Sequence, residues 1–292
     1  MIDPSYIGQI LVNGISVGCI YGLIGIGFCV IYNASGIVNF AQGAFVMLGG
    51  MGAWVLMAKT GMPLLAAGIL ATVLVAGFGV AVERLVVRPL WDRNATMFVM
   101  ILATLAVQIV IDRATLLMVG DQPKSIPVFT DLPPIRIGGV AIGYQILWIV
   151  GVSALMIFLL TQFFQRTLTG RAMRACAINR DAAALQGIRV SHMLALSFAF
   201  SAGLGAIAGF LVTPTQYTAY NVGTPFAISG FIAAIVGGFG RPLGAFLGGI
   251  LLGVAQALAV VVFGSGMKNV AALSLLLMFL FLRPHGILGS AK

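Results

Sequence analysis

Residues 4–58 read PSYIGQILVNGISVGCIYGLIGIGFCVIYNASGIVNFAQGAFVMLGGMGAWVLMA and contain no Asp, Glu, Lys or Arg. A helix needs about 20 mainly apolar residues to cross a lipid bilayer. This stretch is therefore long enough for two crossings. Residues 33–36, Asn-Ala-Ser-Gly, form a turn-like cluster within it, where we expect the first helix to end.

The rest of the chain repeats this pattern. Of its 292 residues, 60% are apolar and only 8% are charged, against roughly 25% charged in soluble proteins. Further uncharged runs cover residues 62–82, 94–111, 137–165, 190–240, 242–267 and 269–282. These runs are too long for the short alternating strands of a β-barrel. We therefore predict an all-α integral membrane protein in which residues 1–292 form a single transmembrane domain, and we exclude a soluble enzyme, a disordered chain and a coiled coil.

The number of spans depends on residues 226–240. Pro214 and the surrounding segment 213–225 separate them from the preceding span. A helix of 15 residues is about 22 Å long, which is short of the hydrocarbon thickness. A short or broken crossing gives nine spans and is the interpretation we favour, whereas a re-entrant loop gives eight. We expect the first span to be retained rather than cleaved as a signal peptide, because residues 1–6 lack a basic segment.

The charges lie between the runs and set the orientation. The net charge is +9, and Lys and Arg in short loops mark the cytoplasmic side of a membrane. Arginines gather in two loops, at Arg84, Arg88 and Arg93 and at Arg166, Arg171, Arg174, Arg180 and Arg189. The loop at residues 120–142 is balanced in charge, so we place it outside, together with the N-terminus and Asp3. The loop at residues 166–190 is then cytoplasmic, as are Arg283, Lys292 and the C-terminus. These charges form no continuous basic face, so nucleic-acid binding is not expected.

Residue types that carry catalysis or bind metals are scarce. The chain has a single Glu, Glu83, which lies beside Arg84, and it contains no nucleotide-binding, nucleophile-elbow or zinc-ligand motif. We therefore predict no catalytic residues, no metal, no cofactor bound to this chain and no enzymatic activity. Cys19, Cys29 and Cys176 are expected to be free thiols.

Intramembrane charges are also few. Carriers coupled to ions place ionisable groups within the membrane, and only Asp112 and Arg113 approach such a position. We expect them to pair with each other, or with a polar neighbour such as Gln108, at the outer interface. The alternative is that they line a permeation path.

Glycines recur every four residues in two places. The first series is Gly14, Gly18 and Gly22, and the second is Gly240, Gly244 and Gly248, with Gly249 and Gly253 on an adjacent face. Small residues at this spacing let membrane helices approach closely. The two halves also show a weak internal similarity, because residues 39–44 and 237–244 each follow a break and lead into a glycine-rich helix.

Paired interrupted helices in two halves indicate the substrate path of transporters built from inverted repeats. On this basis we assign the translocation pathway to Asn39, Phe40, Gln42, Gly43, Gly237, Gly238 and Gly240. The backbone N–H groups of residues 39–43 would be available to a substrate carboxylate.

The loop at residues 167–191 has the pattern of a short surface helix. Asn179 or Asp181 can cap its start, residues 182–185 are strong helix formers, and Gly187 suits its end. Such a helix docks into a groove of a soluble partner. The alternative is an ordinary solvated cytoplasmic loop.

Four segments, taken in order, resemble a known family. They are residues 14–50, Gly-Arg-Ala-Met-Arg-Ala at 170–175, Ala-Ala-Leu-Gln-Gly-Ile at 183–188, and Val-Gly-Gly-Phe-Gly at 236–240 followed by Gly244. Over nearly its whole length the chain is similar to the inner-membrane permease subunits of branched-chain amino acid ABC transporters, of the LivH type.

The resemblance implies a multi-pass protein of the bacterial inner membrane that works with partners. These are a second permease subunit (a related chain or a second copy), two cytoplasmic ATP-binding subunits that bind the ATP, and an extracytoplasmic substrate-binding protein. We assign ATPase coupling to residues that lie in the family's coupling loop and its basic lead-in: Arg171, Arg174, Asp181, Ala183, Ala184, Gly187 and Ile188. Residues 39–43 match the family's early signature near the translocation path.

The implied substrate is a branched-chain or other neutral amino acid. Many relatives carry His at the position of Gln42 and an acidic residue at that of Ala44, so a urea or short-chain amide permease remains an alternative. A stand-alone secondary carrier or channel is the other alternative. The basic Ala/Gly loop and the shortage of intramembrane acids disfavour it.

Overall fold

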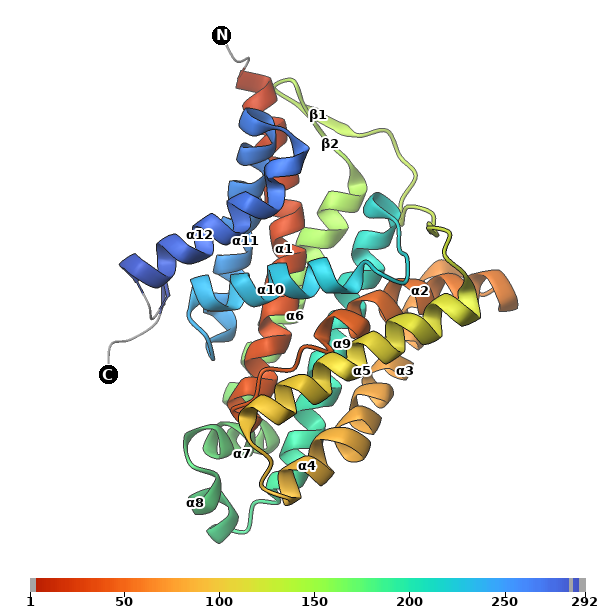
Figure 1. Ribbon diagram of the computed structural model, residues 1–292. Helices are drawn as coiled ribbons and strands as arrows, with labels where there is room; N and C mark the ends of the chain where they lie inside the picture. The colour runs from red at the N-terminus through yellow and green to blue at the C-terminus, as the bar shows by residue number, and fades with distance from the viewer. Residues whose placement is uncertain (1–3, 284–285, 289–292) are drawn as a thin grey trace.

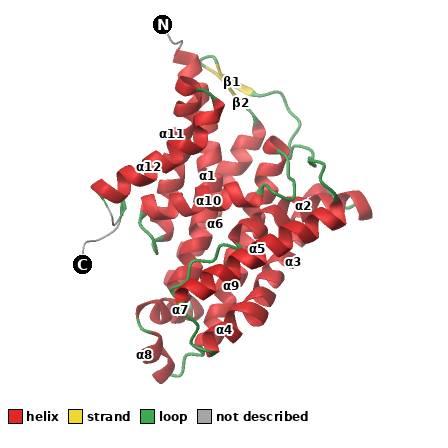
Figure 2. Cartoon of the chain, in the orientation of Figure 1, coloured by secondary structure: helices red, strands yellow, loops and turns green. Residues whose placement is uncertain are grey.

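The computed structural model describes residues 4–283 and 286–288, so Asp3 and Lys292 lie outside the described residues. The chain forms a helical bundle with one small hairpin (Figures 1 and 2). The helices are α1 (Pro4–Ser35), α2 (Gln42–Thr60), α3 (Leu64–Val82), a π-helical turn (Glu83–Val87), α4 (Arg88–Asp92), α5 (Met97–Val119), α6 (Tyr144–Arg166), α7 (Leu168–Ile178), α8 (Arg180–Leu185), α9 (Val190–Gln216), α10 (Gly223–Gly237), α11 (Pro242–Phe263), a 3₁₀ turn (Ser265–Met267) and α12 (Lys268–Leu282). The hairpin pairs β1 (Ile135–Ile137) with β2 (Val140–Ile142).

Helix α1 lies at the centre of this bundle, and α6, α9, α10 and α11 pack against it (Figure 1). Its residues 18–31 are buried without exception. A helix that is apolar on every side is expected in a core rather than at a surface. The apolar stretch that opens the chain therefore supplies the axis of the molecule.

The charge-balanced loop and the basic loop lie at opposite ends of α1. At its start, the Ala141 N–H of the hairpin donates to Gln9 Oε1 at 2.9 Å. At its other end, Asn33 Nδ2 donates to the Gly240 carbonyl at 2.7 Å, and α7 packs against the same helix. The loop at residues 120–142 and the basic loop at residues 166–190 thus lie at opposite ends of the bundle, as the charge pattern predicts.

Eight helices in the described part of the chain are long and apolar enough to span a membrane, and α10 is a shorter apolar helix of 15 residues. Before α10, Thr218 pairs with Lys124 of the external loop, whereas after α10, Gly240 contacts the far end of α1. Helix α10 begins with Gly223 against Gly43 of α2 and lies across α1 rather than along it (Figure 1). The eight long helices agree with the predicted range of eight to nine spans, and the crossing by α10 stays a prediction.

The C-terminal segment lies at the end of α1 that carries the basic loop. The Ile287 N–H donates to the Val236 carbonyl, close to Gly240. The predicted placement of the C-terminus on the side of the arginine-rich loops agrees with this contact.

Two boundaries differ from the sequence predictions. Helix α5 runs to Val119, well beyond the predicted end at residue 111, because Gln108 Nε2 donates to Asp112 Oδ1 at 2.8 Å and the carboxylate is satisfied within the helix. The predicted span at residues 137–165 starts later, as α6, because the chain first forms the hairpin. Gly138 and Gly139 both have positive φ, as a tight two-residue hairpin turn requires.

The predicted packing of glycine-rich helices is confirmed between α1 and α11. A Cβ built on Gly18 would lie 2.7 Å from the Ile250 Cα, and one built on Gly253 would lie 2.5 Å from the Gly18 Cα. Gly14 and Gly22 meet α11 in the same way. The two backbones are in contact, so any side chain along this line would separate them.

Replacing a glycine with alanine should change the free energy of unfolding differently at the contact between α1 and α11 and away from it. We expect Gly253→Ala to lower the free energy of unfolding by about 1–3 kcal/mol, because the methyl group has no space. Gly77→Ala on α3, where nothing lies within 4 Å, should be neutral or stabilising by up to about 1 kcal/mol through helix propensity. The unfolding midpoints of the purified variants in detergent micelles measure both changes. Equal midpoints would show that the helices are not in backbone contact.

Candidate functional site

The break after α1 folds back into the protein. Gln42, the first residue of α2, is fully buried, and its Nε2 donates to the Ser201 carbonyl of α9 at 3.1 Å. The Ser201 hydroxyl bridges Gln42 Oε1 and the Gly27 carbonyl of α1, at 2.5 Å and 2.9 Å. Gly27 precedes the end of α1 by eight residues, about 12 Å of helix. Helix α2 therefore starts inside the bundle, not at its surface.

Side chains of α5 cap this buried helix start. The Phe40 N–H donates to Thr104 Oγ1 at 3.2 Å, and the Ala44 N–H donates to Gln108 Oε1 at 2.5 Å. The Ala41 N–H is bound locally by Asn39 Oδ1 at 3.1 Å. Several of the backbone N–H groups that we expected to be available to a substrate carboxylate are thus already hydrogen-bonded within the chain. A carboxylate would reach them only by displacing these side chains.

Helix α10 begins at the same place. Gly43 and Gly223 are in backbone contact, since a Cβ on Gly43 would lie 2.5 Å from the Gly223 carbonyl oxygen. Gln108 Nε2 would lie 3.1 Å from a Cβ on Gly223. Asn39 Nδ2 is buried and has no hydrogen-bond partner among the described residues. We call these residues, Asn39, Gln42, Gly43, Gln108 and Gly223, the α2–α10 junction.

Gln108 was not among the sequence-predicted site residues, although a signal for it exists. Thr104, Gln108 and Asp112 are spaced by four residues and so share one face of α5. A line of polar side chains along an otherwise apolar membrane helix indicates a buried polar contact. Asp112 bonds to Gln108, as one of the sequence alternatives proposed.

The second predicted pathway segment lies elsewhere. Gly237 packs against the backbone of Gly244, while Gly238 and Gly240 have positive φ in the turn between α10 and α11. Gly240 lines a cavity at the far end of α1 that residues 39–43 do not line. The two predicted pathway segments therefore do not line the same described cavity, although the Phe231 ring lies between them, 5.5 Å from the Phe40 ring and 5.8 Å from the Phe239 ring. In the structure, the segment in contact with Gly43 is the start of α10.

The basic loop forms two capped helices outside the long spans. Thr167 Oγ1 accepts from the Gly170 N–H at the start of α7, and Asn179 Oδ1 accepts from the Ala182 N–H at the start of α8. Of the two candidate caps, Asn179 is the one observed. Gly187, with φ +81°, ends α8 in the left-handed conformation that glycine adopts without strain. The short surface helix predicted from the sequence is present.

This loop exposes apolar side chains. Leu185 is 88% exposed and Ile178 is 87% exposed. The residues assigned to ATPase coupling are mainly at the surface: Arg171, Arg174, Asp181, Ala184 and Gly187 are exposed, Ile188 is half-buried, and Ala183 is buried against the loop. Sequence reasoning did not include Leu185 and Ile178 among them.

Arg180 connects α8 to the bundle. Its guanidinium carbon lies 4.5 Å from the centre of the Trp91 ring of α4, a cation–π contact. Its Nη2 lies against Gly36, the residue at which the break after α1 begins. Burial lowers the pKa of Arg180, opposed by the nearby Cys176 and Asp181. Burial also raises the pKa of the Cys176 thiol, with Arg180 acting in the opposite direction.

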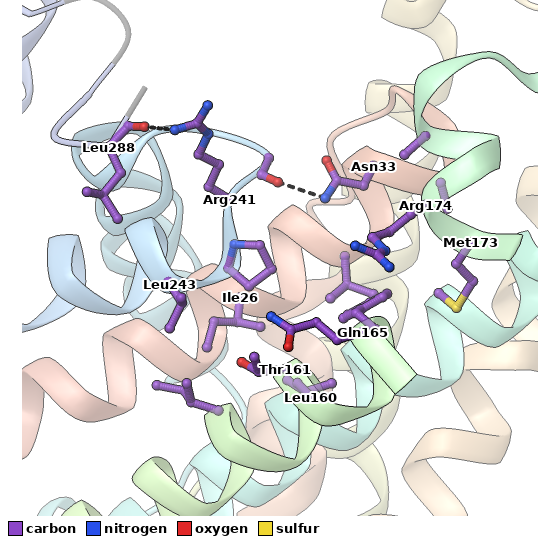
Figure 3. Close-up of a pocket in the computed structure, with 17 residues that line it drawn as sticks. Ile26, Asn33, Leu160, Thr161, Gln165, Met173, Arg174, Arg241, Leu243 and Leu288 are labelled. Carbon is purple, nitrogen blue, oxygen red and sulfur yellow. Dashed lines mark hydrogen bonds between the residues drawn. The ribbon is translucent and has the colours of Figure 1, made fainter. Parts of the chain in front are cut away.

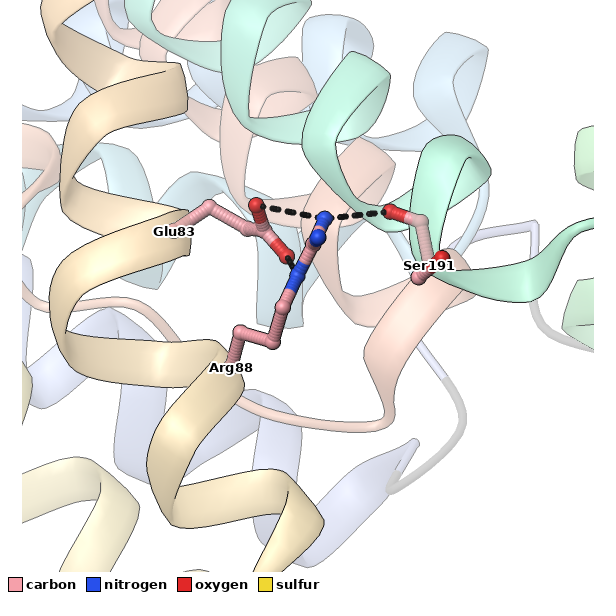
Figure 4. A network of polar contacts seen from close by, with 3 residues as sticks. All are labelled: Glu83, Arg88 and Ser191. Carbon is pink, nitrogen blue, oxygen red and sulfur yellow. Dashed lines mark hydrogen bonds and ion pairs between the residues drawn. The ribbon is translucent and has the colours of Figure 1, made fainter.

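A second polar contact ties the end of α3 to the start of α9 (Figure 4). The Arg88 guanidinium donates to both oxygens of the fully buried Glu83, at 3.0 and 3.1 Å, and to the Ser191 carbonyl at 3.1 Å. Two-point pairing of this kind fixes the orientation of both side chains. Glu83 therefore pairs with Arg88, and it bridges helices rather than serving as a lone membrane-edge charge.

A family described as branched-chain amino acid transport system, permease component, matches residues 10–282. The chain belongs to this family. The permease is similar to the high-affinity branched-chain amino acid transport system permease protein BraD of Pseudomonas aeruginosa, with 38% identity over 96% of this chain and 95% of BraD. It is 30% identical to the corresponding protein LivH of Escherichia coli K12, over 97% of this chain and 96% of LivH.

The permease also has the fold of a solved structure, PsaBC from Streptococcus pneumoniae in complex with Fab. The TM-score is 0.52 at 13% identity, over 95% of this chain and 92% of that chain. Together with the apolar helices, these matches establish a multi-pass membrane permease of the branched-chain amino acid type. The relatives are transport subunits and not enzymes.

Removing the Gln108 amide should destabilise the permease. Gln108→Leu leaves the Ala44 N–H and the Asp112 carboxylate without their partner, which costs about 1–3 kcal/mol for each buried group left unsatisfied. Gln122→Leu changes an exposed amide of the external loop and should shift stability by less than about 0.5 kcal/mol. Unfolding midpoints in detergent measure the difference. Matching midpoints would contradict a structural role for the amide.

Proposed function

We propose that this chain is the membrane-spanning subunit of an ABC importer in the bacterial inner membrane. It would translocate branched-chain or other neutral amino acids delivered by an extracytoplasmic binding protein. A second permease subunit would complete the path, and two cytoplasmic ATP-binding subunits would bind and hydrolyse ATP. The substrate class is supported by the names of the relatives at 38% and 30% identity, which favour it over urea and short-chain amides.

The observation that carries this proposal is the surface of α8. Leu185 is 88% exposed and Ile178 is 87% exposed, in a loop whose other exposed side chains include Arg171, Arg174 and Asp181. Burying a leucine side chain is worth about 1.5–3 kcal/mol, so an apolar residue held at a helix tip by a positive-φ glycine favours a docking surface. A short helix that inserts an apolar side chain into a groove is an established mode of recognition.

Contacts between Arg180 of α8 and the helical bundle connect this surface to the α2–α10 junction. Arg180 touches Gly36, and six residues later the chain enters α2 at Gln42. Movement of α8 on ATP binding would shift the break, and the break holds the start of α2 against Thr104 and Gln108. Opening the path would then require breaking a few hydrogen bonds between α2 and α5. Breaking these hydrogen bonds involves only groups of this chain, so the step needs no coupling ion.

A stand-alone carrier is the competing proposal, and it makes a different prediction. It would transport substrate in liposomes containing this chain alone. The ABC proposal predicts uptake only when the ATP-binding subunits and the binding protein are also present.

Gly187→Trp should abolish ATP-driven uptake while leaving membrane insertion intact. A Cβ added at this residue, which has φ +81°, would meet no atom within 4 Å, so the substitution alters the exposed tip of α8. We expect the variant to lose co-purification with the ATP-binding subunits.

Gly264→Trp is the matched control. Gly264 also has positive φ and open surroundings, but it follows α11 at the external end. This variant should retain the ATP-binding subunits. Normal co-purification and uptake with Gly187→Trp would overturn the docking role of α8.

A further inference from the structure

A cavity of about 450 Å³ opens at the end of α1 that carries the basic loop (Figure 3). Its walls come from α1, α6 and α7 and from the turn between α10 and α11. This volume lies within the range of small-molecule binding sites, roughly 300–1,000 Å³. The cavity does not include the α2–α10 junction, although Arg174 and Gly240, which we assigned to coupling and to the pathway, line it.

The lining changes character along the helices. Ile26 and Val30 of α1 face Ile157 and Leu160 of α6 in the apolar part. One to two turns further along the same helices, Asn33 and Gln165 line the opening. The distance from Ile26 to Asn33 is about 10 Å along the helix axis. The shape and polarity therefore suit an extended amphiphile rather than a compact polar solute.

The charge of the opening is positive. Arg174 of α7 and Arg241 line it, and the described lining residues include no Asp or Glu. Figure 3 shows the Arg241 guanidinium turned to the Leu288 carbonyl, whereas Arg174 points towards Gln165. The described lining residues offer no carboxylate to hold an ammonium group, so an anion suits them better than a zwitterionic amino acid does.

The position of the cavity identifies the source of such a ligand. It lies at the ends of α1 and α6, on the side of the arginine-rich loops, where we expect lipid headgroups to meet the protein. Basic pockets between membrane helices on this side bind anionic headgroups. We propose that the cavity binds an anionic phospholipid, with one acyl chain between α1 and α6 and the phosphate at Arg174.

Lipid retention by the purified permease tests this proposal. Native mass spectrometry would follow the permease in detergent with added phosphatidylglycerol or phosphatidylcholine of the same acyl chains. We expect phosphatidylglycerol to be retained preferentially. Arg174→Gln should weaken its binding about fivefold, the contribution of one cationic side chain near a lipid phosphate.

Two further variants separate the parts of the site. Arg136→Gln removes the same charge from the external hairpin and should leave retention unchanged. Ile157→Trp fills the apolar part and should reduce retention although the arginine remains. Glycerol 3-phosphate and free leucine, added as competitors, should not displace the lipid.

Equal retention by Arg174→Gln and the unmodified permease would overturn the proposal. So would equal binding of the two lipids, or displacement by leucine, which would assign the cavity to transported substrate. None of these measurements uses uptake or ATP hydrolysis, so the outcome is independent of the role of α8.

Discussion

Backbone contact between α1 and α11 is the constraint on which the rest of the structure depends. Membrane helices gain little from hydrophobic burial against one another, because lipid tails are equally apolar, so close packing must hold them together. Gly14, Gly18 and Gly22 remove the side chains that would separate α1 from Gly249 and Gly253. Because α1 lies at the centre of the bundle, the positions of the loops and turns can be described relative to its two ends. One end carries the β1–β2 hairpin, and the other carries the basic loop, the turn after α10 and the cavity lined by Arg174.

A second constraint follows from starting α2 inside the bundle. Backbone N–H groups within a membrane must find partners in the protein, since lipid offers none. Thr104 and Gln108 of α5 supply partners for α2, and Gln42 is held between α1 and α9 by Ser201. The same bonds that satisfy α2 also close the region where α2 and α10 meet. If the path opens here, as we propose, the stability of the resting state and the control of the path depend on the same few polar side chains.

Much of the fold could be predicted because only 8% of the residues are charged and their positions delimit the spans. The break after α1 and the capped helix α8 both follow from local residue types. The features that the sequence did not predict depend on tertiary contacts. The predicted end of α5 was wrong because Gln108 donates a hydrogen bond to the Asp112 carboxylate, so the charged residue is satisfied within the helix. Residues 39–44 and 237–244 line no common described cavity, because similar glycine patterns form a buried helix start in one case and the turn between α10 and α11 in the other.

The central claim is that α8 acts on the path through Arg180, which touches both Trp91 and the break at Gly36. The most direct test is the number of substrate molecules imported per ATP hydrolysed, in proteoliposomes containing the full transporter. Arg180→Ala removes this link without changing the exposed face of α8. The account predicts that the variant binds the ATP-binding subunits and hydrolyses ATP, while uptake per ATP falls sharply. An unchanged ratio of uptake to hydrolysis would contradict it.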